Sequence, residues 1–282
     1  MNNINLEFWG VRGSVPSPGP DTAKYGGNTS CVSITLNNKI LILDAGTGIR
    51  NLGTTLLSKP DMEIFVVITH THWDHIQGFP FFTPIYQPNR PVHMFPTIHK
   101  KNVVLSSLID QMDGAHFPIT PDQVPSNFNF ITENPLDFLK DNGFIIELVP
   151  MNHPGGAFGY KITVENKTIC YFTDNEIDPP YVKSIEISEL IKKCHKVDVL
   201  IHDAQYIEED MPLKHGWGHS LINQVTDLGK DAQVKKLIYF HHDPERSDDL
   251  LDEEFKKASI YLKEVGSSVK PYFASEGLKI KL

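Results

Sequence analysis

Short runs of apolar residues, separated by turn-forming and polar positions, recur along most of the chain. Runs of four to six apolar residues are typical of β-strands, and continuous rather than alternating apolar character is typical of strands buried on both faces. The pattern predicts strands at Leu6–Trp9, Cys31–Leu36, Ile40–Leu43, Ile64–Ile68, Val92–Phe95, Ile145–Val149, Tyr160–Val164, Thr168–Phe172, Val197–Ile201 and Leu237–Phe240.

Helical periodicity is clearest near the carboxyl end of the sequence. Ser247 precedes two acidic residues, as at a helix N-cap, and Gly266 provides a stop. Between them, apolar residues recur on one helical face: Leu251, Phe255, Ala258 and Leu262. Similar patterns predict helices over about 47–57, 184–194 and 219–229. An α/β fold with two sheets between layers of helices accommodates this order.

The interval 97–142 breaks every periodicity, because four prolines interrupt it: Pro118, Pro121, Pro125 and Pro135. We predict an irregular insertion with a short helix near 103–111. Such an insertion is either a lid over a site or a surface excursion without a role. The sequence contains no repeat and no Gly/Ser linker, so a single domain over 1–282 is the simpler prediction.

The composition limits the classes of protein to which the chain can belong. It is 40% hydrophobic and 22% charged, which is typical of a soluble globular protein. The longest apolar runs are too short to cross a bilayer, and the amino-terminal residues lack the pattern of a signal peptide. We therefore expect a cytoplasmic location and no membrane partner.

The net charge of −9 argues against a nucleic-acid polymer as a partner, since such binding requires clustered basic residues. A small anionic substrate would need a local source of positive charge, such as a metal ion. The three cysteines, Cys31, Cys170 and Cys194, are widely spaced and are predicted to be reduced and buried. A homodimer is compatible with this composition.

Histidine is concentrated in one motif, His70-Thr71-His72-Trp73-Asp74-His75, directly after the strand predicted at Ile64–Ile68. Imidazole nitrogens and a carboxylate at a strand end are ligands suited to Zn²⁺, with Mn²⁺ and Fe²⁺ as alternatives. Isolated core histidines would not cluster in this way.

This HxHxDH motif resembles the signature of the metallo-β-lactamase superfamily, and the resemblance extends over nearly the whole chain. It implies an αββα four-layer sandwich and two divalent metal ions. Of the motif residues, His70 and His72 would bind one ion, and Asp74 and His75 the other. The ligands implied later in the chain are His153, bridging Asp174 and His241.

Each later ligand has a structural alternative. His153 and Asp174 could be ordinary turn residues, because each follows an apolar run and His153 precedes Pro-Gly. His241 and His242 are adjacent, so only one of them can point into a site. The position directly after the strand favours His241, which leaves His242 either behind the ligands or in a structural role.

Two further segments resemble the phosphodiesterase branch that contains ribonuclease Z. They are His202-Asp203-Ala204-Gln205 and Gly218-His219-Ser220. By this resemblance His219 would contact the phosphate and assist the leaving group, and Asp203 would orient His219. Ribonuclease Z has Glu where this chain has Asp203, and His219 could instead simply begin a helix.

The amino-terminal segments 8–14 and 26–31 look like the opening of the phosphoribosyl cyclic phosphodiesterase group. Arg12 would then help to bind an anion, or it is a structural ion-pair partner. Asp44, in Asp44-Ala45-Gly46-Thr47-Gly48, resembles the early acidic residue that supports the metal loop from behind.

The resemblance implies a binuclear-metal phosphodiesterase in which a metal-bridging hydroxide attacks phosphorus, Asp74 positions it and His219 protonates the leaving group. We expect a small cyclic phosphodiester, 3′,5′-cyclic nucleotides first, because no basic tRNA-binding arm is evident. Candidates for a base-stacking wall are Trp73, Phe79, Phe81, Phe82, Phe117 and Trp217. The alternatives are a thioesterase or lactonase of the glyoxalase II kind and a noncatalytic metal-dependent ligand-binding protein.

Overall fold

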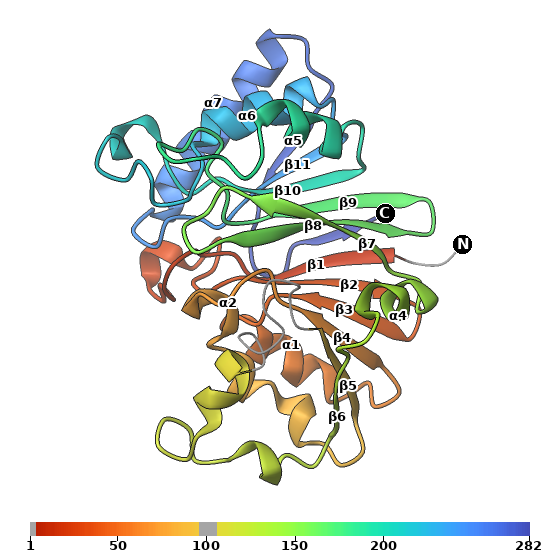
Figure 1. Ribbon diagram of the computed structural model, residues 1–282. Helices are drawn as coiled ribbons and strands as arrows, with labels where there is room; N and C mark the ends of the chain where they lie inside the picture. Colours follow the sequence, from red (N-terminus) through yellow and green to blue (C-terminus); the bar gives the residue numbers. More distant parts are fainter. Residues whose placement is uncertain (1–3, 96–105) are drawn as a thin grey trace. The chain divides into compact units, whose positions relative to one another are not determined.

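The computed structural model describes residues 4–95 and 106–282 (Figure 1). The chain divides into two compact units, each built from separate stretches of sequence. Unit 1 comprises Met1–Pro16, Gly26–Phe144 and Ser275–Leu282, and unit 2 comprises Ser17–Tyr25 and Ile145–Ala274. The prediction of a single domain over 1–282 stays a prediction.

Unit 1 is built on a seven-stranded sheet with the order β13-β1-β2-β3-β4-β5-β6. The strands are β1 (Ile4–Gly10), β2 (Cys31–Leu36), β3 (Lys39–Leu43), β4 (Glu63–Val67), β5 (Pro91–Phe95), β6 (Asn127–Phe130) and β13 (Lys279–Lys281). Pairing is antiparallel from β13 to β3 and parallel from β3 to β6. The helices are α1 (Ile49–Leu56), α2 (Trp73–Ile76) and α4 (Pro135–Asp141). Helix α1 buries Ile49, Leu52 and Leu56 in the apolar core of the unit.

Unit 2 is built on a six-stranded sheet with the order β12-β11-β10-β9-β8-β7. The strands are β7 (Ile145–Met151), β8 (Ala157–Val164), β9 (Lys167–Phe172), β10 (Val199–Asp203), β11 (Lys236–Phe240) and β12 (Lys270–Phe273). Strands β9 to β12 are parallel. The helices α5 (Ile187–Cys194), α6 (Ile222–Asp231) and α7 (Asp248–Glu264) lie along one side of this sheet (Figure 1). Because the parallel strands all end at the same edge, residues that follow β9, β10 and β11 come together there.

Short 3₁₀ helices complete the connections in both units. They lie at Pro20–Thr22, Phe79–Phe81, Thr83–Tyr86, Asp110–Met112, Pro121–Gln123 and Glu208–Asp210. The three cysteines are free and buried, as predicted. No helix among the described residues is both long and apolar enough to span a membrane. The cytoplasmic location stays a prediction.

All ten predicted strands are confirmed, and so is the helix predicted after Ser247, whose Oγ accepts a hydrogen bond from Leu250 N at 3.3 Å. Three strands were not predicted: β6, β12 and β13. Each of them is the outermost strand of its sheet. Edge strands need not be apolar on both faces, so their sequences lack the continuous apolar runs that identify the inner strands.

The segment 97–142 is more regular than predicted where the structure describes it. Residues 106–109 are helical and continue into the 3₁₀ helix Asp110–Met112, whereas the predicted start of that helix at 103–105 lies outside the described residues. Strand β6 and helix α4 were expected to be irregular, which is wrong. Their prolines do not interrupt them, because Pro125 precedes β6 and Pro135 lies in the first turn of α4.

Candidate metal centre

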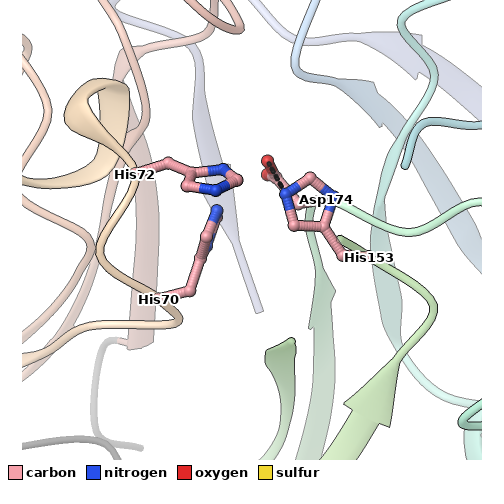
Figure 2. Close-up of side chains that lie close together, drawn as sticks. All are labelled: His70, His72, His153 and Asp174. Atoms are coloured by element: carbon pink, nitrogen blue, oxygen red, sulfur yellow. Dashed lines mark ion pairs between the residues drawn. The ribbon is translucent and has the colours of Figure 1, made fainter. Parts of the chain in front are cut away.

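The HxHxDH motif of unit 1 occupies the loop after β4 and the short helix α2. The rings of His70 and His72 lie side by side with their centroids 4.5 Å apart (Figure 2). The ring centroids of His70 and His75 are 4.4 Å apart. An Asp74 carboxylate oxygen is 3.2 Å from His75 Nε2. His72 is exposed, whereas His70, Asp74 and His75 are buried. The motif therefore brings four potential metal ligands together within six consecutive residues.

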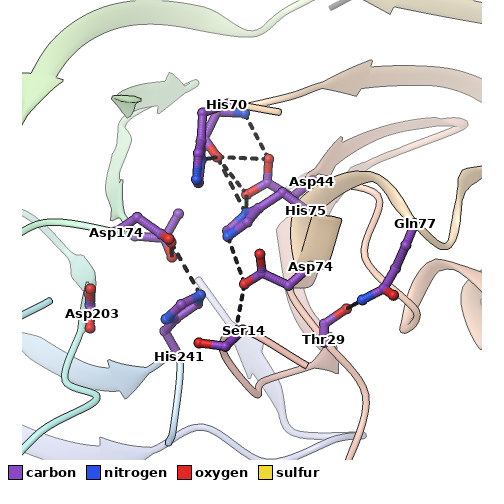
Figure 3. Close-up of polar contacts among 12 residues, drawn as sticks. Ser14, Thr29, Asp44, His70, Asp74, His75, Gln77, Asp174, Asp203 and His241 are labelled. Carbon is purple, nitrogen blue, oxygen red and sulfur yellow. Dashed lines mark hydrogen bonds and ion pairs between the residues drawn. The ribbon is translucent and has the colours of Figure 1, made fainter. Parts of the chain in front are cut away.

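Asp44 directly follows β3, the parallel neighbour of β4, and supports this motif (Figure 3). Its carboxylate accepts hydrogen bonds from Thr69 N at 2.7 Å and Thr69 Oγ1 at 3.0 Å, and it lies 2.8 Å from His75 Nδ1. A carboxylate at Nδ1 holds the proton on that nitrogen and leaves the Nε2 lone pair for a metal ion. Asp44 thus has the supporting contacts that the sequence resemblance implied.

Asp74 is oriented by a contact that the sequence did not predict. The backbone N–H of Ser14 donates to Asp74 Oδ2 at 2.8 Å. On the other side of α2, Ala45 N donates to His75 O at 2.8 Å, and Gly46 lies against the Asp74 carbonyl with no space for a Cβ atom. Backbone groups from two loops therefore fix the short helix.

Unit 2 contains three candidate ligands of its own, each at the end of a strand. His153 follows β7, Asp174 follows β9 and His241 follows β11. His153 Nε2 is 3.8 Å from Asp174 Oδ2, and His241 Nε2 is 3.3 Å from Asp174 Oδ1 (Figures 2 and 3). All three side chains are buried. One carboxylate with an imidazole at each of its oxygens is the arrangement expected of a bridging ligand.

The other ring nitrogen of each of these histidines is held by an acceptor. His153 Nδ1 lies 3.0 Å from the Gly218 carbonyl, and His241 Nδ1 lies 3.0 Å from Gln205 Oε1. Both partners are oxygens that can only accept, so Nδ1 carries the proton and Nε2 presents a lone pair. Metal-binding histidines are typically held in this way. Together with the carboxylates, these imidazoles form a donor set that fits Zn²⁺ and similar divalent ions.

His219 and Asp203 form a buried pair close to these ligands in unit 2. His219 Nδ1 is 2.7 Å from Asp203 Oδ2, and the His219 ring stacks on that of His241 at 5.0 Å. Burial raises the pKa of the Asp203 carboxyl well above its usual value, the Asp174 carboxylate adds to this, and His241 opposes it. The short contact places one proton between the two side chains, so Nε2 is the nitrogen of His219 that is left for a substrate.

The loop that carries His219 is held by Glu176, a residue to which the sequence assigned no role. Its buried carboxylate accepts hydrogen bonds from Gly216 N at 2.8 Å and from Gly218 N at 2.9 Å. Gly218 adopts a φ of +94°, and a Cβ atom there would overlap the His153 ring. Glu176 therefore holds the backbone on which both His153 and His219 depend.

Two other predicted candidates lie in structural surroundings. His242 stacks on Phe273 with centroids 5.6 Å apart and an interplanar angle of 13°, and its Nε2 lies 2.9 Å from the Ala274 carbonyl. This placement favours its structural alternative. Arg12 is fully buried, and its Nε donates to the Gly26 carbonyl at 2.9 Å. A contact between Arg12 and substrate stays a prediction.

Comparisons with known proteins identify relatives of similar sequence and of similar fold. The profile described as "Beta-lactamase superfamily domain" matches residues 39–242. The ribonuclease Z of Staphylococcus epidermidis is 25% identical over 285 residues, covering 84% of this chain and 88% of that protein. The metallo-β-lactamase fold protein YhfI from Bacillus subtilis superposes with a TM-score of 0.68 at 15% identity, covering 99% of this chain and 100% of YhfI. Unliganded yeast PDE1 has a TM-score of 0.69 at 13% identity, with complete coverage of both chains.

Proposed function

Since the chain belongs to the β-lactamase superfamily and is a metal-dependent phosphoric diester hydrolase, we propose that its substrate is a small cyclic phosphodiester. The family and the fold class predicted from the HxHxDH motif are confirmed. Among small phosphodiesters, 3′,5′-cyclic nucleotides are the first candidates.

We further propose that the chain holds two divalent ions, with Zn²⁺ first. The proposed ligands are His70, His72, Asp74, His75, His153, Asp174 and His241. Two such ions, when bound, supply an acidified water molecule and neutralise negative charge on the phosphate. The support for this set is its chemistry: buried carboxylates, and imidazoles whose Nδ1 atoms are held by acceptors.

The observation that carries the phosphodiesterase assignment is the pair of His219 and Asp203. A proton donor at this position serves a leaving group that departs as an alkoxide, which is far too basic to leave unassisted. A thiolate needs no such donor, because thiols ionise with a pKa of about 8.5. The 2.7 Å contact to Asp203 orients the His219 ring, and Nε2 is the atom that donates once it too carries a proton. This pair therefore favours a phosphodiester over a thioester.

Asp74 has a second proposed role, as the residue that positions and deprotonates the nucleophilic water. Its Oδ2 atom is fixed by the Ser14 N–H at 2.8 Å and is 3.2 Å from His75. A carboxylate that a backbone N–H holds in one orientation is already positioned for proton transfer, which suits a general base.

The net charge of the chain favours a small substrate over a nucleic-acid polymer. The chain carries a net charge of −9, whereas a tRNA-sized polymer requires an extended basic surface to displace its counterions. A single small phosphate group requires only the local charge that metal ions supply.

The decisive experiment is turnover by the metal-reconstituted protein on four substrates: cyclic AMP, cyclic GMP, a lactoyl thioester and a precursor tRNA. We expect cleavage of the cyclic nucleotides and none of the thioester. Cleavage of the thioester alone would place the chain with the glyoxalase II kind, and cleavage of the precursor tRNA alone would overturn the small substrate. Saturable binding of a cyclic nucleotide without turnover would support the noncatalytic alternative.

A further inference from the structure

A hollow in unit 1 adjoins the HxHxDH motif. It has a volume of about 620 Å³, and its walls include Trp73, Gln77, Phe81, Asp110, Gln111 and Phe117. Ligand sites for small molecules have volumes of about 300–1,000 Å³. We propose that this hollow, called the aromatic pocket below, binds the nucleobase of the substrate. The proposal rests on the proposed function and names the residues that would select a nucleotide.

The pocket is continuous in sequence and structure with the proposed metal ligands. Thr71 and Trp73, which flank His72, both line it. Trp73 is also the first residue of α2, the helix that carries Asp74 and His75. A ring bound against Trp73 therefore lies beside the loop at which we place the phosphate.

The aromatic side chains that line the pocket are largely exposed instead of being packed in the core. The exposed fraction is 66% for Trp73 and 53% for Phe81, and the ring of Phe117 meets that of Phe81 edge to face at 5.3 Å. Phe79 and Phe82, which the sequence analysis also proposed as stacking residues, are buried in the core. Clustered exposed aromatic rings are characteristic of binding sites, and flat heterocycles stack on them.

The polar groups of the pocket favour a base over a phosphate. Its wall contains the carboxylates of Asp110 and Asp113 and the amides of Gln77 and Gln111. Hydrogen bonds from His116 lower the pKa of Asp113 to about 2, so this carboxylate is charged at neutral pH. Carboxylates repel a phosphate group, but they accept hydrogen bonds from the amino groups of adenine, guanine or cytosine.

The wall opposite α2 is tethered to it before any ligand binds. Gln111 Nε2 donates to the Ile76 carbonyl at the end of α2, at 3.3 Å, and to the Ser107 carbonyl at 3.1 Å. A pocket that is formed in advance loses less entropy on binding. The aromatic pocket can therefore recognise a base without a large rearrangement.

The first test measures binding independently of catalysis. In the metal-loaded Trp217→Phe variant, adenosine should quench the fluorescence of Trp73 in a saturable manner, and the further change Trp73→Phe should remove that signal. Stacking on an aromatic ring contributes to the affinity for a base, so Phe81→Leu should weaken adenosine binding roughly tenfold. Phe81→Tyr should retain the affinity, and Leu57→Ala, which removes an exposed apolar side chain elsewhere in unit 1, should not change it.

The second test measures selectivity. Phe81→Leu should reduce kcat/KM for cyclic AMP relative to its abasic counterpart about tenfold, since a base-free ring has nothing to stack. Absence of saturable quenching by adenosine, or equal affinity in the Phe81→Leu variant, would overturn the aromatic pocket even if cyclic AMP is hydrolysed. Adenosine binding that depends on Phe81, with no phosphodiester turnover, would retain the pocket and overturn the proposed function instead.

Discussion

The orientation of the key histidine side chains in this protein is set by the hydrogen-bond partners of their rings. His153, His219 and His241 each have Nδ1 within 3.0 Å of an oxygen acceptor, and that contact decides which nitrogen remains for chemistry. The acceptors come from other segments of the chain. The roles of these histidines therefore depend on residues far away in sequence.

The proposed proton donor can be tested through the leaving group. We expect His219→Ala to lower kcat on a cyclic nucleotide by about 10²–10³, because general acid catalysis contributes 10²–10⁴. The loss should be much smaller on a p-nitrophenyl phosphodiester, whose leaving group needs no proton. Metal content, measured by elemental analysis, should not change, and the exposed His195→Ala serves as the control. Equal losses on both substrates would contradict the role of His219 as a proton donor.

Glu176 should act on metal binding through the backbone. In Glu176→Gln, an amide N–H replaces one of the oxygens that accept from Gly216 N and Gly218 N. The Gly218 carbonyl then no longer holds His153 firmly, and loss of such support typically lowers metal affinity 10–100-fold. Chelator competition would measure the change in affinity, with the exposed Glu253→Gln as the control. Unchanged affinity would show that the loop does not need Glu176.

His202 should make the protein sensitive to acid. It is fully buried and neutral, with Nδ1 2.7 Å from the Asp203 carbonyl, and burial lowers its pKa from 6.5 to about 4. The unfolded chain therefore takes up a proton between pH 6.5 and 4 that the folded protein does not, and stability falls as the pH drops through this window.

The free energy of unfolding should fall by roughly 3 kcal/mol over this window because of His202 alone. Urea unfolding of the metal-free protein at pH 7 and pH 4.5 would show it. In His202→Asn the difference between the two pH values should be smaller by about 2–3 kcal/mol. The same pH dependence in both proteins would exclude His202 as the source.

At the scale of elements, the loop after β3 and helix α2 form one packed assembly. Gly46 has no space for a side chain, because a Cβ atom there would overlap the Asp74 carbonyl, the Thr29 hydroxyl and the Ser30 carbonyl. We expect Gly46→Ala to destabilise the protein by about 2–4 kcal/mol, since two of these three atoms are backbone and cannot rotate away. Thermal unfolding would measure this effect. Gly19→Ala is the matched control, because its nearest neighbour would lie 3.9 Å away and its φ is extended.

Strands and ligands that have a distinctive sequence pattern of their own could be predicted. Strands and residues whose roles depend on contacts with distant parts of the chain could not. Inner strands such as β4 and β10 contain continuous runs of three or four apolar residues, whereas β12 and β13 carry lysines that an edge position tolerates. The ligand residues were accessible because they form a motif and follow strands. Ser14, Glu176 and Gln205 were not, because their contacts reach residues 36 to 60 positions away with no periodic pattern.

The backbone conformation at the strand ends could not be predicted from the sequence either. Asp44, Asp174 and His241 all adopt positive φ, at 63°, 52° and 60°. Non-glycine residues rarely occupy this region, and they persist there where surrounding contacts compensate the strain. The sequence placed these residues after strands but gave no sign of the turn that aims each side chain back toward the sheet edge.

At the scale of the whole molecule, the proposed ligand set predicts how metal affects stability. Ions that bind the folded protein at 1,000 times their Kd stabilise it by about 4 kcal/mol. Chelation should therefore lower the melting temperature. His72→Ala and His153→Ala each remove one proposed ligand, and each should abolish most of the metal-dependent increase. Two independent, additive increments would indicate that each unit binds metal by itself.

The pairing of β1 with β13 brings two ends of the described chain together, because Leu282 N donates to Ile4 O at 3.1 Å and Asn5 lies opposite Lys281. A short linker could join these ends, and new ends could be opened at the exposed hairpin turn of Glu165 and Asn166. Such a circular permutation would leave every strand with the same neighbours, but β9–β12 would be synthesised before β1–β6, and β7 and β8 would come last. Its yield of active protein would show whether this fold depends on the order of synthesis or on the final set of contacts alone.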